Sequence, residues 1–201
     1  MKLLIATRNP DKLAEMRALL NVPGLHVLCI NDIPQAPEVE EDGFTFEENA
    51  LKKATVLARA TGLWALADDS GLEVAALGGI PGVHSARYAG EPVKYSANNE
   101  KLIAALREEP DRRAQFRTVI ALSSPAGVAR TVEGRCAGVI VEHARGQGGF
   151  GYDPLFQPEG YSQTFAEMSS ELKNKISHRA HALARAKENW PALFSSDPVE
   201  W

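Results

Sequence analysis

Two adjacent aspartates, Asp68 and Asp69, follow the apolar run at residues 63–67. Two carboxylates about 4 Å apart repel by roughly 4 kcal/mol at an effective dielectric constant of ~20, so a pair that faces one site needs a cation or a proton between its members. Hard cations such as Mg²⁺ bind one or two carboxylates together with waters and substrate phosphates. The pair, which we expect at the end of a buried strand, therefore predicts a metal site.

A second acidic pair, Glu40 and Glu41, lies in a loop that is rich in proline and acidic residues. Such a pair on its own is more often a solvated surface feature. The next helix begins at a capping box formed by Thr45 and Glu48, in which each residue caps the other. Lys53 follows about one and a half turns beyond Glu48, where its ammonium group could reach a phosphate.

The stretch ATRNPDK, residues 6–12, carries groups that suit an anion. A strand ends there in a polar loop that opens a helix, and N–H groups at a helix N-terminus attract phosphate. Thr7, Asn9 and Lys12 add a hydroxyl, an amide and an ammonium. The stretch lacks the glycine spacing of a Walker loop, which excludes an ordinary P-loop NTPase. The alternative, that Asn9 is only a helix cap, stays open.

The stretch GGFGYDPLF, residues 148–156, indicates contact with a flat ligand. Glycines on both sides of Phe150 let the backbone and the ring approach closely, and stacking of an aromatic ring on a base contributes about 1–3 kcal/mol. Asp153 could accept a hydrogen bond from a ring N–H. The alternative is a glycine turn with Phe150 in the core.

The stretch ELKNKISHRAHALARAK, residues 171–187, has an apolar stripe at helical spacing. Lys173, His178 and Arg179 fall outside this stripe and could donate hydrogen bonds to a purine carbonyl. A keto oxygen accepts such bonds, whereas an amino group in the same place would leave the donors unpaired. The pattern therefore favours keto purines over adenine.

Hydrophobic periodicity and turn residues predict a mixed sheet in an α/β fold. Strands and helices alternate early in the chain, and strands pair later around the turn at residues 124–127. We expect strands at residues 2–6, 26–30, 63–67, 116–122 and 128–142, helices at residues 10–20, 45–61, 96–106 and from 169 onward with a second cap at Ser177, and a long irregular loop at residues 78–92.

Composition limits the classes of protein that the chain can belong to. Its 201 residues suit a single α/β domain, and 44% hydrophobic with 24% charged residues argues against disorder and membrane spans. A net charge of −4 argues against nucleic acid as a partner. The short apolar run near the N-terminus is no signal peptide, so we expect a cytoplasmic protein whose two cysteines, Cys29 and Cys136, stay reduced.

Six blocks, in family order from Thr7 to Arg179, resemble the inosine triphosphate pyrophosphatase family: TRNPDK, GFTFEENALKKA, ADDSGL, GGIPGVHSARYAG, GGFGYDPLF and KNKISHR. The resemblance implies hydrolysis of aberrant purine nucleoside triphosphates (ITP, dITP, XTP) to the monophosphate and pyrophosphate, by Mg²⁺-assisted attack of water on the α-phosphorus. It also implies one domain over residues 1–201 with an elongated, two-lobed α/β fold. In that fold a long twisted mixed sheet with flanking helices leaves a nucleotide cleft between the lobes, and the usual assembly is a homodimer.

The resemblance also implies roles for individual residues. Asp69 would be the general base and a Mg²⁺ ligand, with Asp68 and either Glu40 or Glu41 completing the acidic site. The residues implied to hold the triphosphate are Thr7, Arg8, Asn9, Lys12, Lys53 and Ser70, of which Lys53 also counts as catalytic together with the two aspartates. Those implied to form the base pocket are Phe150, Gly151, Tyr152, Asp153, Lys173, His178 and Arg179.

Three other classes are weighed against this interpretation. The related Maf family of pyrimidine nucleotide pyrophosphatases would have an arginine-rich opening loop and would lack GGFGYDPLF. A catalytically silent nucleotide-binding module would gain little from crowded acids such as Asp68 and Asp69 beside a phosphate. A phosphatase of the haloacid dehalogenase type would need an Asp-x-Asp pair, which ADDSG does not supply.

Overall fold

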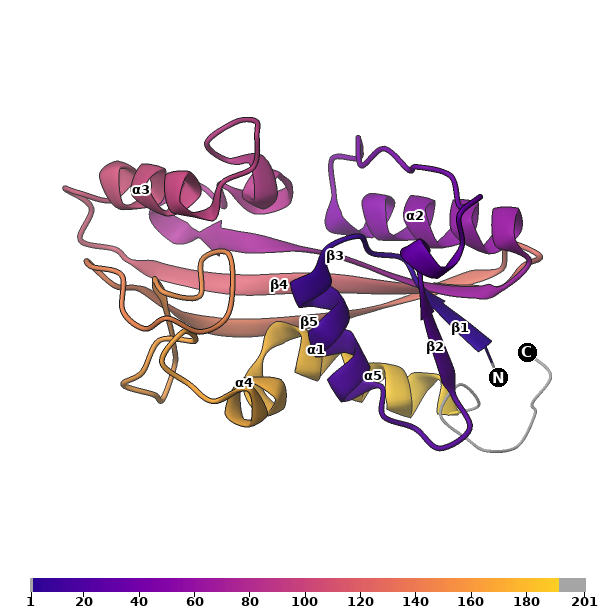
Figure 1. Cartoon of the computed structure of the whole chain (residues 1–201). Coiled ribbons are helices and arrows are strands. Elements are labelled where there is room, and N and C mark those ends of the chain that lie inside the picture. Colours follow the sequence, from indigo (N-terminus) through magenta and orange to yellow (C-terminus); the bar gives the residue numbers. More distant parts are fainter. Residues whose placement is uncertain (1, 192–201) are drawn as a thin grey trace. The chain divides into compact units, whose positions relative to one another are not determined.

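The structure is a computed structural model and describes residues 2–191 (Figure 1). Its six strands form one sheet in the order β2-β1-β3-β4-β5-β6. Strand β1 runs parallel to β2 and β3, whereas β6 is antiparallel to β5, so the predicted mixed α/β sheet is confirmed. The elements are β1 (Lys2–Ile5), α1 (Pro10–Leu19), β2 (His26–Cys29), α2 (Phe46–Thr61), β3 (Trp64–Val74), α3 (Tyr95–Ala105), β4 (Arg113–Ser123), β5 (Ala129–Ile140), β6 (Phe156–Pro158), α4 (Ser170–Ile176) and α5 (His178–Asn189), with short 3₁₀ helices η1 (Ile30–Asp32), η2 (Ala75–Leu77) and η3 (Gly82–Arg87).

The chain divides into two compact units. Among the described residues, unit 1 consists of residues 2–69, Thr118–Gly134 and residues 179–191, and unit 2 consists of Ser70–Arg117 and Arg135–His178. Strands β3, β4 and β5 each contribute residues to both units. No helix within residues 2–191 is long and apolar enough to cross a membrane.

The core of unit 1 forms around β1, which helices cover on both faces. In Figure 1, α2 lies on one side of the unit 1 strands, and α1 and α5 lie on the other. Leu3 and Ile5 of β1 therefore pack with Met16 of α1 and with Leu183 and Trp190 at the C-terminal end of the chain. Each such side chain, when fully buried, contributes about 1.5–3 kcal/mol. This core fixes the carboxyl ends of β1 and the first part of β3.

Capping residues set the ends of the unit 1 helices, as predicted. Asn9 caps α1, where Pro10 occupies the first helical position, and proline is favoured there because it lacks an N–H group. Thr45 and Glu48 form the capping box of α2, and Gly62 ends that helix with a φ of 67°. A left-handed residue at this position favours glycine, which has no Cβ to clash.

Unit 2 has a separate core that is rich in aromatic rings. Phe116 of β4 lies edge-on to Phe156 of β6, with ring centroids 4.8 Å apart, and it stacks on Phe165 at 5.9 Å. Leu102 of α3 is fully buried in the same cluster. The predicted loop at residues 78–92 is irregular but contains the 3₁₀ helix η3.

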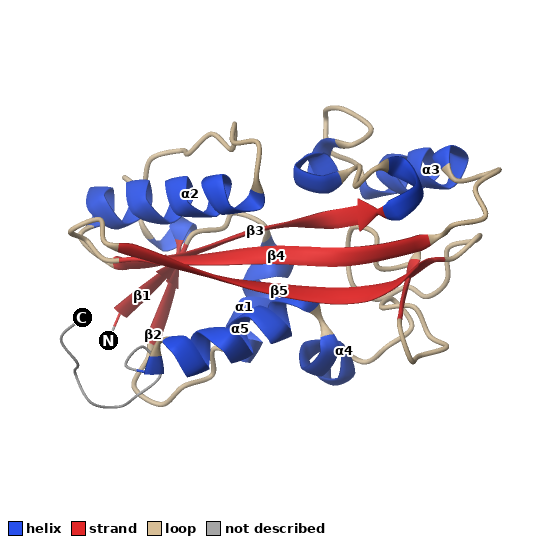
Figure 2. Cartoon of the chain, turned by 180° about the vertical axis from the view of Figure 1, so that it is seen from behind, coloured by secondary structure: helices blue, strands red, loops and turns tan. Residues whose placement is uncertain are grey.

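Strands β4 and β5 form the predicted hairpin (Figure 2). The Ser124 N–H donates to the Val128 carbonyl over 2.9 Å, and the Gly127 N–H donates to the Ser124 carbonyl over 2.9 Å. A turn this short can join neighbouring strands only if they are antiparallel. The predicted pairing is therefore confirmed.

The prediction for β3 was wrong in one respect. We expected the strand to end at residue 67, but it continues to Val74, so Asp68 and Asp69 lie inside it. Polar residues continue the strand because β4 lies beside it in the sheet and supplies partners for its backbone groups. One such anchor is the Thr118 hydroxyl, which donates to the Asp69 carbonyl over 3.1 Å.

Candidate active site

The parallel pairing of β1 and β3 determines which polar segments meet in unit 1. Ile5 pairs with Leu66, and the Ala6 N–H donates to the Leu66 carbonyl over 2.8 Å. The chain then leaves β1 for α1 at the level where β3 reaches Asp68. Because the carboxyl ends of parallel strands lie at the same edge, the start of α1 and Asp68 come together.

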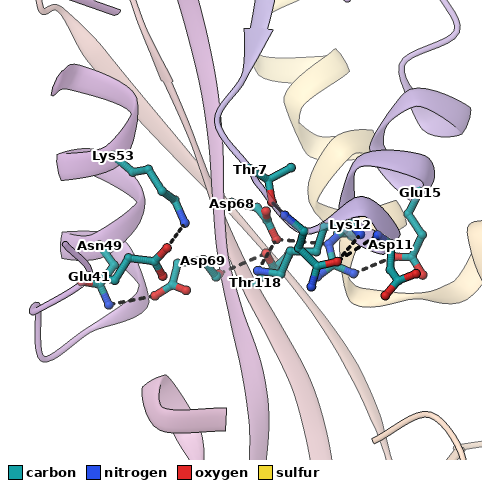
Figure 3. Close-up of polar contacts among 12 residues, drawn as sticks. Thr7, Asp11, Lys12, Glu15, Glu41, Asn49, Lys53, Asp68, Asp69 and Thr118 are labelled. Carbon is teal, nitrogen blue, oxygen red and sulfur yellow. Dashed lines mark hydrogen bonds and ion pairs between the residues drawn. The ribbon is translucent and has the colours of Figure 1, made fainter. Parts of the chain in front are cut away.

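Asp68 and Asp69 do not share one environment, contrary to the sequence-based prediction. Successive residues of a strand point to opposite faces of the sheet. In Figure 3, Asp68 points toward Lys12, whereas Asp69 points toward Asn49 of α2. The repulsion that we expected a metal between them to relieve is reduced by this separation, by a different hydrogen-bond partner for each carboxylate, and by the positive charges of Lys12 and Lys53, which act on both.

Asp68 belongs to a buried ionic group with Lys12, Glu15 and Arg179, called here the Asp68 group. Its Oδ2 lies 3.2 Å from Lys12 Nζ and accepts a hydrogen bond from Arg179 Nε over 3.1 Å. Arg179 also donates to Glu15 Oε2 over 2.6 Å. Burial alone would raise the pKa of Asp68, but the charges of Lys12 and Arg179 lower it far below its usual range. Asp68 is therefore a permanent anion that holds two cations.

Asp69 belongs to a second group with Glu41, Asn49, Lys53 and Thr118, called here the Asp69 group. Its Oδ2 accepts a hydrogen bond from Asn49 Nδ2 over 2.9 Å. Burial raises the pKa of Asp69 to about 6, and the negative charge of Glu41 acts in the same direction. The positive charges of Lys12 and Lys53 and the bond from Asn49 act against this rise. Asp69 is therefore a carboxylate that exchanges a proton near neutral pH.

Lys53 and Glu41 form an ion pair within the Asp69 group. Lys53 Nζ donates to Glu41 Oε1 over 2.7 Å, and the lysine side chain is only 9% exposed. Burial alone would lower the pKa of Lys53, but the nearby carboxylates, Glu41 foremost, raise it. Lys53 therefore stays charged. Of the two glutamates that the sequence left open, Glu41 lies in this group, whereas Glu40 is exposed to solvent.

The loop before α1 uses part of its polar groups for its own structure. Asn9 Oδ1 accepts from the N–H groups of Asp11 and Lys12, over 2.9 and 3.2 Å, and Thr7 Oγ1 accepts from the Asn9 N–H over 3.1 Å. These helix N–H groups are therefore engaged by the cap, so the predicted capping role of Asn9 is confirmed. Arg8 is exposed to solvent.

In unit 2 the structure brings together three of the residues predicted to contact the base. Asp153 Oδ2 accepts hydrogen bonds from the Phe150 N–H, over 2.8 Å, and from Lys173 Nζ. The Lys173 ammonium also lies 4.9 Å from the centre of the Phe150 ring. A cation at this distance over the face of an aromatic ring is attracted to the ring. The loop at residues 148–153, called here the aromatic loop, is thereby tied to α4.

The other predicted residues of unit 2 have different surroundings. Tyr152 is buried, and its hydroxyl donates to the Ser85 carbonyl over 2.9 Å. His178 is buried with its ring stacked on Phe116, 4.8 Å between centroids. Gly151 has a φ of 62°, and Ser70 follows Asp69 in β3, half-buried.

The structure places Arg179 in the Asp68 group of unit 1, whereas the other residues predicted to contact the base lie in unit 2. Its guanidinium group is 2% exposed and contacts Asp68 and Glu15. These ionic contacts give Arg179 a function in unit 1 that the KNKISHR block did not reveal.

Three residues of the two groups were missed in the sequence. Glu15 stands three residues after Lys12 on the same helix, a spacing that places the two side chains on one face. Asn49 is a buried asparagine inside a helix, where asparagine is unfavourable, and that was a usable signal. For Thr118, which lies inside an apolar strand, the sequence offered no such signal.

Within the described residues, no three histidine, cysteine, aspartate or glutamate side chains gather to hold a metal ion. Mg²⁺ usually keeps several waters and takes only one or two carboxylates, together with substrate phosphates. The donor set of Asp69 and Glu41 fits such an ion, because Glu41 raises the pKa of Asp69 and so lies near enough for the two charges to interact.

Comparison with known proteins gives consistent matches over nearly the whole chain. The model of the Ham1 family matches residues 3–189. A dITP/XTP pyrophosphatase of Desulforamulus reducens is 54% identical over 201 residues, covering 99% of this chain and 100% of that protein. One of Geobacter sulfurreducens is 54% identical over 190 residues, covering 94% and 96%. The solved structure of the Staphylococcus aureus Ham1 protein matches with a TM-score of 0.86 and 41% identity, covering 95% of this chain and 98% of that one.

Proposed function

The chain belongs to the Ham1 family, and we propose on this premise that it hydrolyses aberrant purine nucleoside triphosphates to the nucleoside monophosphate and pyrophosphate. The substrates are dITP, XTP and ITP. The names of the curated relatives, dITP/XTP pyrophosphatase, support this class of reaction. The single observation that carries the proposal is the environment of Asp69.

Asp69 has the properties of a general base. A base works best when its pKa lies near the working pH, and burial raises the pKa of Asp69 to about 6. Asn49 fixes the orientation of the carboxylate through the bond to Oδ2. In the proposed reaction, water attacks the α-phosphorus, the bond from that phosphorus to the α–β bridging oxygen breaks, pyrophosphate leaves, and the water proton passes to Asp69.

Lys12 and Lys53 supply positive charge for the triphosphate. Lys12 Nζ is held against Asp68, yet the lysine side chain keeps 18% of its surface exposed, and Lys53 is held against Glu41. Preorganised cations of this kind stabilise the charge that develops on a leaving phosphate. In this proposal Asp68 takes no proton; it positions Lys12.

Mg²⁺ is proposed as the cofactor, with Asp69 and Glu41 as the residues that would hold it. When bound, the ion would polarise phosphate oxygens and help to orient the attacking water. The mutual repulsion of the two carboxylates supports this assignment, because a divalent cation would relieve it. Glu40, which is exposed, is left out of the set.

The base is assigned to unit 2. Phe150 is proposed to stack on the purine, and Lys173 to donate to its keto oxygen. Lys173 is buried and fixed by Asp153, and an ammonium offers only donors. An adenine amino group is also a donor, so it would find no acceptor there, which favours keto purines over adenine.

The test is a substrate panel with both possible phosphate products measured. The purified protein is incubated with Mg²⁺ and separately with ITP, XTP, GTP and ATP. We expect pyrophosphate from ITP and XTP in preference to GTP and ATP. For ATP, whose amino group would leave the Lys173 ammonium unpaired, kcat/KM should be at least about 100-fold lower than for ITP, the scale on which a buried polar site rejects a substrate that leaves it unpaired. Orthophosphate as the main product, or equal turnover of ATP, would contradict the proposal. Binding of ITP without turnover would favour a silent nucleotide-binding module.

The homodimer and the cytoplasmic location remain predictions. Sedimentation velocity of the purified chain tests the first, with a mass near twice 21.8 kDa expected.

A further inference from the structure

We propose that Asn99 of α3 is a positioning residue that holds the aromatic loop in the conformation needed to receive the purine base. The inference rests on the proposed function of that loop. Asn99 touches neither Phe150 nor Lys173 through a hydrogen bond; its contact is with the loop backbone, where the Asn99 Nδ2 group donates to the Gly151 carbonyl over 3.0 Å.

The loop needs such a tie because its backbone is tightly wound. Gly149 and Gly151 both have positive φ values, 67° and 62°. A Cβ at Gly149 would lie 2.0 Å from Asp153 Oδ2, so the chain wraps closely around that carboxylate. Asp153 holds the start of the loop through the Phe150 N–H. The Gly151 carbonyl lies beyond this bond, and Asn99 is the side chain that fixes it.

Asn99 differs from its neighbour Asn98 in what its side chain does. Asn98 is satisfied inside one segment: its Oδ1 accepts from the Ala89 N–H over 2.7 Å, and its Nδ2 donates to the Ala86 carbonyl over 2.9 Å. Asn98 therefore serves the fold of the segment that contains η3. Asn99 reaches across 52 residues of sequence to the aromatic loop.

The oxygen atom of the Asn99 amide is evidence that this residue does not serve packing alone. Its Oδ1 is buried and, within residues 2–191, has no hydrogen-bond partner. A buried acceptor without a partner is unfavourable, and asparagine is a poor residue for a helix interior. Leucine would serve packing better at this position. The hydrogen bond to the Gly151 carbonyl therefore explains why an asparagine stands at this position.

A second contact from α3 reaches the same loop. Tyr95 precedes Asn99 by four residues, one turn of helix, so the two side chains share a face. The Tyr95 ring lies 6.2 Å from the Phe150 ring at an interplanar angle of 45°. One face of α3 thus meets the loop at both Phe150 and Gly151, which makes α3 the support of the proposed base-stacking ring.

The test compares Asn99→Ala with Glu100→Ala, a neighbouring exposed position. We expect Asn99→Ala to raise KM for ITP about 3- to 10-fold, the effect of one lost neutral hydrogen bond, with kcat changed less than about 2-fold. The inhibition constant of inorganic tripolyphosphate should stay unchanged, since this compound has no base for the aromatic loop to receive. Glu100→Ala should match the wild type throughout.

Hydrogen exchange gives a readout that does not depend on turnover. Amides at residues 149–153 should exchange at least about 3-fold faster in Asn99→Ala, because the loop opens more often when one tie is lost, while those of α2 in unit 1 should not change. Unchanged exchange in the loop, or equal losses for ITP and tripolyphosphate, would overturn the proposal. If Asn99→Ala fails to fold, the same measurements on Asn99→Ser decide the question. A wild-type protein that releases no pyrophosphate from ITP refutes the proposed function, and the exchange test still decides whether Asn99 holds the loop.

Discussion

The same substitution at two adjacent residues is expected to change stability in opposite directions. Asp69 has a pKa raised from 3.8 to about 6 in the folded protein. Between about pH 4 and pH 6 the folded state therefore keeps a proton that the unfolded chain has lost, and the free energy of unfolding falls as the pH rises through this window. Two pKa units correspond to about 3 kcal/mol. Asp69→Asn should thus stabilise the protein by up to about 3 kcal/mol at pH 8, a gain that nearly vanishes at pH 4.

Asp68→Asn should do the reverse. The pKa of Asp68 is lowered by Lys12 and Arg179, so its contribution to stability is present above its unfolded pKa and persists at pH 4. Removing the carboxylate leaves the buried Arg179 and the half-buried Lys12 with one partner fewer. Breaking a buried ion pair in this way costs about 3–5 kcal/mol, and we expect that loss at both pH values.

Urea unfolding of the metal-free protein, followed by circular dichroism at pH 8 and pH 4, measures both effects. The slope of the free energy of unfolding against urea should stay constant, so that the midpoint alone reports stability. If Asp68→Asn and Asp69→Asn shift the midpoint in the same direction and by similar amounts, the two carboxylates share one environment, and the assignment of separate roles is refuted.

Three further changes test individual contacts. Gly43→Ala would place a Cβ 2.7 Å from Asn49 Oδ1, so Asn49 must shift from Asp69. The kcat for ITP should then fall about 10-fold, the scale of a displaced catalytic group. Unchanged steady-state pyrophosphate release would show that Asn49 does not orient Asp69. Lys173→Met leaves Asp153 buried without its cation. KM for ITP should rise at least about 10-fold, as expected for a lost charged hydrogen bond, while the inhibition constant of tripolyphosphate stays constant. A parallel change in both constants would show that Lys173 does not recognise the base. Thr45→Ala removes the capping box of α2 and should lower the free energy of unfolding, measured by thermal unfolding, by about 1 kcal/mol. The kcat should stay within about 2-fold of the wild-type value. A larger loss of kcat would show that Thr45 has a role beyond the cap.

Features that depend on neighbouring residues were predictable from the sequence. The Thr45 and Glu48 capping box, the Asn9 cap and the break at Ser177 all act within a few residues, and the structure has each of them. The family resemblance carried by the six motif blocks is confirmed by the family match over residues 3–189. The predicted enzyme class agrees with the names of the curated relatives.

Features that depend on distant residues were not predictable in the same way. Local sequence does not show that β4 extends β3 past residue 67, so the placement of Asp68 and Asp69 on opposite faces was missed. Arg179 reaches Asp68 over 111 residues of sequence, and no periodicity in either segment indicates that contact. The choice between Glu40 and Glu41 likewise depends on Lys53, twelve residues further along the chain.

The central claim is that water attacks the α-phosphorus of a keto-purine nucleoside triphosphate with the help of Asp69. One measurement addresses it most directly: hydrolysis of ITP in ¹⁸O-labelled water, stopped early, with mass spectrometry of both products. We expect one ¹⁸O atom in IMP, none in pyrophosphate, and loss of both products with Asp69→Asn. Label in pyrophosphate or in orthophosphate, or undiminished turnover by Asp69→Asn, would contradict it.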